Sequence, residues 1–190
     1  MTVLVAYASA HSSASRIAQQ IADRLLKSGF AAAARPVGDI VSLQPYRAVV
    51  LGSHVRQQVW LPEAAEFLHR FVGQLAKLPV WLFSSGSSDE TSPKGATFIR
   101  RTGHESQALT GAPAAIRFRD QRHFAGAFER AGSNPFFDLF SKVCGGSPAD
   151  KRDWREINEW AASIARELQG IDHVKERRRL HLSVRGKPQA

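Results

Sequence analysis

Short, continuous apolar runs alternate along this chain with segments in which apolar residues recur at helical spacing. Runs at residues 3–7, 48–52 and 79–83 have no polar interruption, which is typical of strands buried on both faces. Residues 31–37 and 123–128 predict two weaker strands. Strands separated by helical segments indicate parallel β-α-β units, and so an α/β protein with a doubly wound sheet.

Three segments predict the main helices. Apolar residues at helical spacing fill 17–25, and Gly29 follows where a helix C-cap belongs. Pro62, a favoured first-turn residue, opens a second helix whose apolar stripe runs to Leu75. A long helix is expected over residues 150–169, starting near Asp150 or Asp153.

Composition indicates one globular domain. The 190 residues are 43% hydrophobic and 23% charged, which suits a single well-packed core. Cys144 is the one cysteine, so the sequence offers no intramolecular disulfide and no cysteine-based metal cluster, and we expect no metal site. A single thiol also fits a reducing cytoplasm, the expected location.

The charge is unevenly distributed. The net charge is +9, and residues 173–190 carry six Lys or Arg residues against Glu176 alone. We therefore divide the chain into a domain at 1–170 and a basic, flexible tail at 171–190. The tail is either a solvated end or a weak anchor for an anionic surface, including the inner face of a membrane, and no specific nucleic-acid site is expected.

Polar loops follow three of the predicted strands, at residues 9–15, 52–60 and 84–91. Ligands of open parallel sheets bind beyond the carboxyl ends of the strands. The first loop contains four serines and leads directly into a helix, whose N-terminus suits a phosphate. One serine is enough to cap that helix, so capping alone remains the alternative. The loop has neither a G-x-G-x-x-G nor a P-loop pattern.

At these loops the sequence resembles a known family. Residues 7–18, YASAHSSASRIA, resemble the first FMN-phosphate loop of flavodoxins, T-x-T-G-x-T. Residues 50–56, VLGSHVR, are similar to the G-A-S-I-R segment of flavodoxin-like menaquinone-dependent protoporphyrinogen oxidases. Residues 124–128, 144–146 and 153–154 are similar to that branch in the same order. The resemblance implies a flavodoxin-like five-stranded parallel sheet, in the order 2-1-3-4-5, with helices on both faces.

The same resemblance implies FMN as the cofactor, and the three loops after the strands supply the residues expected to hold it. The residues expected to hold FMN are Ser9, His11, Ser12, Ser13 and Ala14 in the first loop, Ser53, His54, Val55, Arg56 and Trp60 in the second, and Ser84, Ser85 and Gly86 in the third. Ser12 and Ala14 stand where the family motif has glycine and threonine, and Gln57 and Gln58 where the branch has an aromatic residue and a glycine.

Three of these residues have alternative interpretations. Trp60 either stacks on the flavin ring or packs under the helix opened by Pro62. Arg56 either places its charge near the flavin or a substrate carboxylate, or faces solvent. His54 either carries protons or is a hydrogen-bonding surface residue. Arg56 and His54 are the candidate catalytic residues.

Two functions remain open on the sequence. The first is an FMN oxidoreductase that oxidises a small anionic substrate, a porphyrinogen by resemblance, and passes electrons to a quinone or a redox protein. The positive net charge suits such a substrate and an anionic membrane surface. The second is a flavodoxin-type electron carrier, or a domain of this fold that binds a partner instead of flavin.

Overall fold

The computed structural model describes residues 2–8, 13–56, 59–86, 112–125 and 153–185. Within these ranges the side chains of Arg56, Lys175 and 178–185 lie outside the description.

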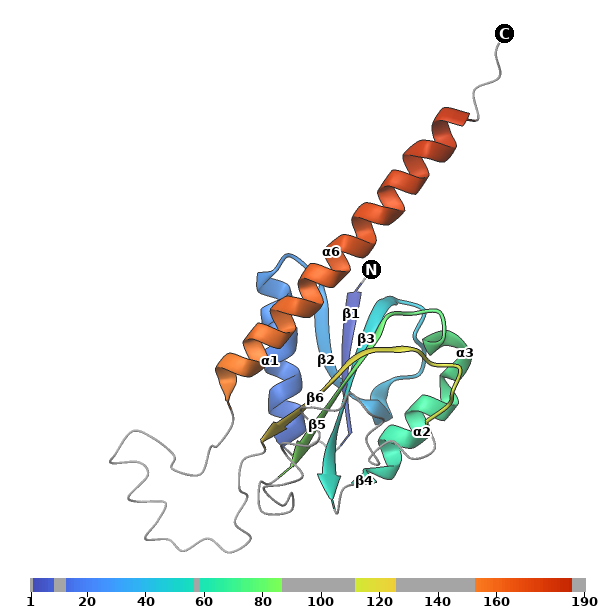
Figure 1. The fold of residues 1–190 in the computed structure, drawn as a ribbon. Coiled ribbons are helices and arrows are strands. Elements are labelled where there is room, and N and C mark those ends of the chain that lie inside the picture. Colours follow the sequence, from blue (N-terminus) through green and yellow to red (C-terminus); the bar gives the residue numbers. More distant parts are fainter. Residues whose placement is uncertain (1, 9–12, 57–58, 87–111, 126–152, 186–190) are drawn as a thin grey trace, which may run out of the picture.

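Five parallel strands form the sheet, in the order β2-β1-β3-β5-β6 (Figure 1). The two-residue strand β4 pairs antiparallel with the end of β3. The predicted doubly wound sheet and its order are therefore confirmed, with β4 as an addition. The strands are β1 (Thr2–Tyr7), β2 (Ala32–Pro36), β3 (Tyr46–Arg56), β4 (Val59–Trp60), β5 (Val80–Gly86) and β6 (Phe118–Ala125).

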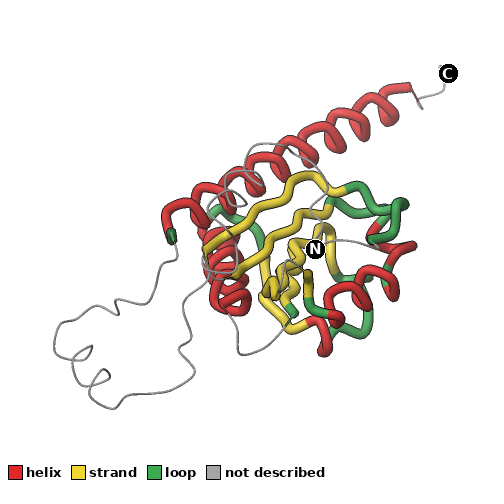
Figure 2. Tube along the Cα trace, turned by 60° about the horizontal axis from the view of Figure 1, so that its bottom comes forward, coloured by secondary structure: helices red, strands yellow, loops and turns green. Residues whose placement is uncertain are grey.

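Helices cover both faces of the sheet (Figure 2). One face carries α1 (Ser13–Lys27) and α6 (Trp154–Arg185). The opposite face carries the short η1 (Val37–Asp39), α2 (Pro62–Arg70) and α3 (Val72–Leu75). The stripe that we predicted as one helix to Leu75 is thus two helices, separated at Phe71.

Strand alternation divides the core into two layers. On β5, Trp81 and Phe83 pack toward α1 and α6, whereas Leu82 packs toward α2. All three side chains are buried, and burial of each contributes about 1.5–3 kcal/mol. Gly52 on β3 lies under the Phe83 ring, and a Cβ at this position would overlap the ring. Glycine therefore lets the aromatic ring lie flat against the neighbouring strand.

The helix ends follow the sequence signals. Gly29 has φ +88° just after α1, a conformation that side chains other than glycine rarely adopt. Pro62 is the first residue of α2. Asp153 caps α6, because its Oδ1 accepts the backbone N–H groups of Arg155 and Glu156 at 3.0 and 3.1 Å. The three predicted helix ends are confirmed, with Asp153 rather than Asp150 as the cap.

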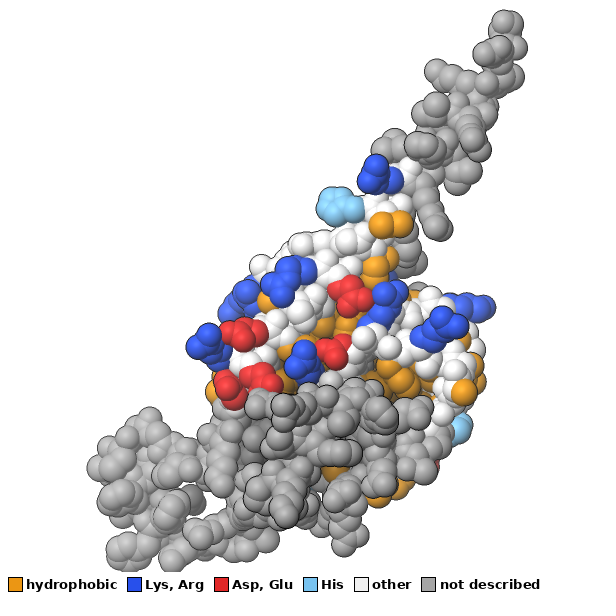
Figure 3. Space-filling model, in the orientation of Figure 1, with side chains coloured by type: hydrophobic (Ala, Val, Ile, Leu, Met, Phe, Trp, Pro, Cys, Tyr) orange, Lys and Arg blue, Asp and Glu red, His pale blue; other side chains and the backbone are white. Residues whose placement is uncertain are grey.

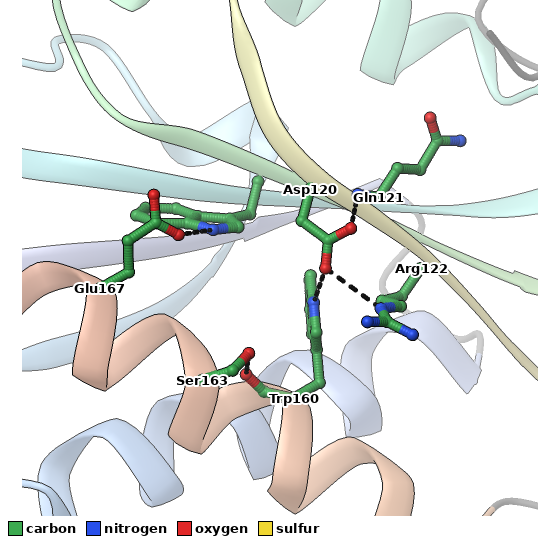
Figure 4. A network of polar contacts seen from close by, with 7 residues as sticks. Asp120, Gln121, Arg122, Trp160, Ser163 and Glu167 are labelled. Atoms are coloured by element: carbon green, nitrogen blue, oxygen red, sulfur yellow. Dashed lines mark hydrogen bonds and ion pairs between the residues drawn. The ribbon is translucent and has the colours of Figure 1, made fainter. Parts of the chain in front are cut away.

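Carboxylates attach α6 to the sheet (Figure 4). Asp120 on β6 accepts a 2.8 Å hydrogen bond from Nε1 of Trp160. Glu167 on α6 accepts from Nε1 of Trp81 at 3.2 Å and from Arg119 at 3.0 Å. Indole N–H groups at a helix–sheet interface need such acceptors, so these bonds satisfy donors that burial would otherwise leave unpaired.

Helix α6 is longer than the sequence predicted. It continues through 32 residues to Arg185, whereas we expected it to end near residue 169. Asp172 forms an ion pair with Arg47 at the start of β3, and beyond this contact α6 projects past the rest of the fold (Figure 1). Residues 171–185 are therefore helical rather than an irregular tail. None of the described helices is long and apolar enough to span a bilayer.

Candidate functional site

The carboxyl ends of β1, β3 and β5 lie side by side at one edge of the sheet. Tyr7 pairs with Gly52, and His54 pairs with Ser85, so the three strand ends are adjacent. The chain turns from β1 to α1 at this edge, and the order of strands reverses between β1 and β3. A doubly wound sheet binds its ligands at such a switch point.

Several site residues that we expected in loops belong to regular structure. Ser13 and Ala14 form the first turn of α1, because the helix begins at Ser13. Ser53, His54, Val55 and Arg56 extend β3, and Ser84, Ser85 and Gly86 extend β5. The parallel strands remain paired beyond their apolar runs, so the polar residues at the strand ends also belong to the sheet. Ser9, His11, Ser12, Gln57, Gln58 and the Arg56 side chain lie outside the described residues.

A hydrogen bond between two serines joins α1 to the sheet. Ser13 Oγ donates to Ser85 Oγ at 3.0 Å, and both hydroxyls are buried. The bond places the first residue of α1 over the carboxyl end of β5. The first turn of α1 contains no acidic residue. No carboxylate in this turn therefore neutralises the positive end of the helix dipole, which can bind an anion.

Ser53 has a structural role. Its Oγ accepts the backbone N–H of Leu61 at 3.1 Å and donates to the His54 carbonyl at 2.9 Å. Leu61 precedes α2, so these bonds fix the start of α2 against β3. Because its hydroxyl is occupied, Ser53 supports the site rather than offering a free donor.

Trp60 lies in the core between β4 and α2. It is 5% exposed and belongs to the cluster that contains Ala64 and Phe67. This placement matches the packing alternative, since the ring is buried beneath the helix opened by Pro62. Its Nε1 is buried and has no hydrogen-bond partner among the described residues. A buried N–H of this kind is costly unless a ligand or solvent accepts from it.

His54 presents a second buried polar atom. Its Nδ1 has no partner among the described residues, although the side chain as a whole is half-buried. His54 and Trp60 come from the paired ends of β3 and β4. Trp60 pairs with Val55 and shares its face toward α2, so strand alternation places His54 on the opposite face, toward α1. The polar edge of a planar ligand such as a flavin ring can pair with Nδ1 of His54 on that face.

His123 belongs to this edge, and the sequence analysis did not identify it. Its Nδ1 is 2.9 Å from Ser84 Oγ, and its backbone pairs with that of Ser84 across β5 and β6. Burial lowers the pKa of His123, and the nearby Glu156 carboxylate opposes this shift. His123 is therefore neutral at pH 7. We predicted strand 123–128, but β6 begins at Phe118, so His123 lies near the end of the strand rather than at its start.

The described residues contain no group of three or more His, Cys, Asp or Glu side chains that could hold a metal ion. The chemistry of this edge in the described part of the chain is that of hydroxyl groups, two histidines and a helix N-terminus. These groups can bind an anion and the polar edge of a planar ligand.

A family model and several solved structures match the chain. The model described as Flavodoxin domain matches residues 4–128, about two thirds of the chain. No curated protein sequence matches it. The fold is similar to a cysteine-to-serine mutant of flavodoxin from Pseudomonas aeruginosa, at 17% identity and a TM-score of 0.54, over 89% of this chain and 99% of that one.

Two longer proteins share the fold. The Flv1 flavodiiron core from Synechocystis sp. PCC6803 is 16% identical, with a TM-score of 0.57 over 90% of this chain. The rubredoxin oxygen:oxidoreductase from Desulfovibrio gigas is 16% identical, with a TM-score of 0.52 over 89%. The chain spans 36% of the length of each. Neither the family model nor these structures supports the protoporphyrinogen oxidase branch.

FMN is the cofactor that this family implies, and the described residues fit it. The N-terminus of α1 would hold the phosphate, because its first turn contains no acidic residue to compete for the helix dipole. His54 would meet the ring through its unpaired buried Nδ1. Because the family model spans most of this doubly wound domain and the helix start at its switch point suits the phosphate, the chain belongs to the flavodoxin domain family.

Proposed function

We propose that this chain is an FMN-binding electron-transfer domain of the flavodoxin type, which takes electrons from one redox protein and passes them to another. The observation that carries the proposal is the start of α1. Its first turn lacks acidic residues and is fixed over the carboxyl end of β5 by the Ser13–Ser85 hydrogen bond. Family membership supports the same cofactor.

FMN supplies the redox chemistry when bound, by accepting and releasing one or two electrons. The residues of the chain bind and orient it. The dipole of α1 stabilises the phosphate, and Gly86, at the end of β5, presents no side chain to the ligand. Neutral His123, bonded to Ser84, adds no charge beside the ligand at pH 7.

Protoporphyrinogen oxidation is the second candidate. The motif over residues 50–56 and the net charge of +9 favour it, since a basic protein attracts an anionic substrate. A quinone would then accept the electrons, and the basic end of α6 would bring the protein to a membrane surface. Neither the substrate nor the acceptor follows from the described geometry, so this candidate depends on the sequence motif.

An anaerobic reduction experiment distinguishes the two functions. The FMN-loaded protein is mixed with NADPH and a flavoprotein reductase, or with protoporphyrinogen, and the flavin absorbance is followed. If the protein is an electron carrier, the reductase bleaches its flavin, and the flavin absorbance returns when cytochrome c is added as acceptor. If protoporphyrinogen bleaches the flavin and the reductase does not, the electron-carrier function is rejected in favour of protoporphyrinogen oxidation. Failure of both reductants would refute a redox function.

A further inference from the structure

A polar groove lies between α1 and α6, outside the site at the carboxyl edge. Its volume is about 880 Å³. Gln20 and Asn158 meet across it through a 2.7 Å hydrogen bond, and Glu159 is its one carboxylate. Its four cations are Arg24, Lys27, Arg155 and Arg166. The groove therefore has an excess of positive charge.

Three carboxylates of α6, those of Glu159, Glu167 and Asp172, have partners of their own. Glu159 pairs with Arg155 at 2.8 Å. Glu167 accepts from Trp81 and from Arg119 on β6, and Asp172 pairs with Arg47 at the start of β3. Across the described part of the chain no ion pair neutralises three cations of the groove, which are Arg24, Lys27 and Arg166.

The positive charge continues along α6 beyond the groove. Arg155, Arg166 and Arg177 follow one another at spacings of 11 residues, which places them on one side of the helix. This row is about 33 Å long at 1.5 Å per residue. His173 and Arg177 are exposed, and Figure 3 shows basic side chains along the face that carries α6.

We propose that this groove and the adjoining row of cations bind an acidic segment of the protein that exchanges electrons with the flavin. The inference rests on the proposed electron-transfer function. Gln20 lies about two helical turns from Ser13, so the groove starts close to the edge of the sheet where FMN belongs. A segment bound there holds its parent protein beside that edge.

The lining favours a protein over other polyanions. Arginine recognises carboxylates through two parallel hydrogen bonds, and the amides and the carboxylate of the groove can pair with the mixed polar groups of a polypeptide. A second copy of the chain would bring like charges together.

Binding of an acidic peptide to the FMN-loaded protein tests the proposal. The probe is a fluorescein-labelled peptide of about ten glutamates, which spans the row when extended at about 3.3 Å per residue. The groove variant is Arg24→Glu/Lys27→Glu/Arg166→Glu. The control, Arg35→Glu/Lys77→Glu/Arg117→Glu, reverses the same charge at exposed residues outside the groove.

We expect the groove variant to bind the peptide about tenfold more weakly than wild type, and the control to change much less. Added salt should weaken the wild-type complex. An equal loss of peptide affinity in the groove variant and the control, or no binding of the peptide by wild type, would overturn the proposal. If the groove substitutions weaken the binding of oligo-dT or of phosphatidylglycerol vesicles more than the binding of the peptide, the groove is assigned to those anions instead. FMN content, measured by absorbance, tests the proposed function separately.

Discussion

Ser13 Oγ donates a 3.0 Å hydrogen bond to Ser85 Oγ. The bond connects the first residue of α1 to β5, which lies two positions from β1 in the sheet. The two serines are 72 residues apart in sequence. Their contact fixes where the positive end of α1 lies relative to the strand ends. Any ligand phosphate held by α1 depends on this position.

Ser85→Ala should lower the free energy of unfolding by about 1–3 kcal/mol, because it leaves the Ser13 hydroxyl buried without its acceptor. Ser13→Ala/Ser85→Ala should cost less than the sum of the single changes. Urea unfolding of the four proteins measures the coupling. Additive losses would show that the two hydroxyls do not interact.

Gly52→Ala should destabilise the fold by about 1–3 kcal/mol, since the added methyl group overlaps the Phe83 ring. Gly38→Ala is the matched control, because a Cβ there meets no atom within 4 Å. Thermal melts of both variants test the contact. Equal melting temperatures for the two variants would mean that the ring does not lie against Gly52.

Trp60 allows its packing and its ligand contact to be separated. Trp60→Ala should cost about 3–5 kcal/mol of stability, since the ring is buried under α2. Trp60→Phe keeps most of the packing and removes the unpaired N–H. We expect Trp60→Phe to melt near the wild-type temperature and to bind FMN with unchanged affinity, because the ring packs under α2. Weaker FMN binding by Trp60→Phe would show that Nε1 is a ligand contact.

His123 makes stability depend on pH. Burial lowers its pKa in the folded state below the ordinary 6.5, so the unfolded chain binds the proton more readily. The His123 contribution to stability should therefore fall as the pH drops below 6.5, and level off once the folded protein is protonated as well. His123→Gln should remove this part of the pH dependence in urea titrations. A slope unchanged by the substitution would contradict the assignment.

The sheet was predictable because buried parallel strands leave a simple pattern. The runs at 3–7, 48–52 and 79–83 required no tertiary information, and they fix three of the five strands. The ends of those strands could not be predicted. Ser53 and Ser84 look like loop residues in sequence, and only pairing with the neighbouring strand keeps them in the ladder.

The site was predictable in outline and not in its contacts. The helix N-terminus after β1 and the strand ends were expected at the same edge. The Ser13–Ser85 bond depends on how α1 crosses the sheet, which no local pattern encodes. His123 was missed as a site residue because five consecutive polar residues, 119–123, fill most of its strand, and an apolar run indicates only its last part. The length of α6 was underestimated because its last turns have no apolar stripe against the fold.

The central claim is that α1 holds the phosphate of FMN, and comparison of FMN with riboflavin tests it most directly. Titrations followed by flavin fluorescence give both dissociation constants for wild type, Ser15→Asp and Gln19→Asp. Ser15→Asp puts a carboxylate in the first turn of α1, which suits the helix dipole and repels a phosphate. Gln19→Asp adds the same charge on the exposed side of the second turn.

We expect wild type to bind FMN at least about tenfold more tightly than riboflavin, because the phosphate adds interactions that riboflavin lacks. Ser15→Asp should remove most of this preference while riboflavin binding stays near wild type. Gln19→Asp should retain the preference. Equal affinity of the wild-type protein for FMN and riboflavin would contradict a phosphate site at α1.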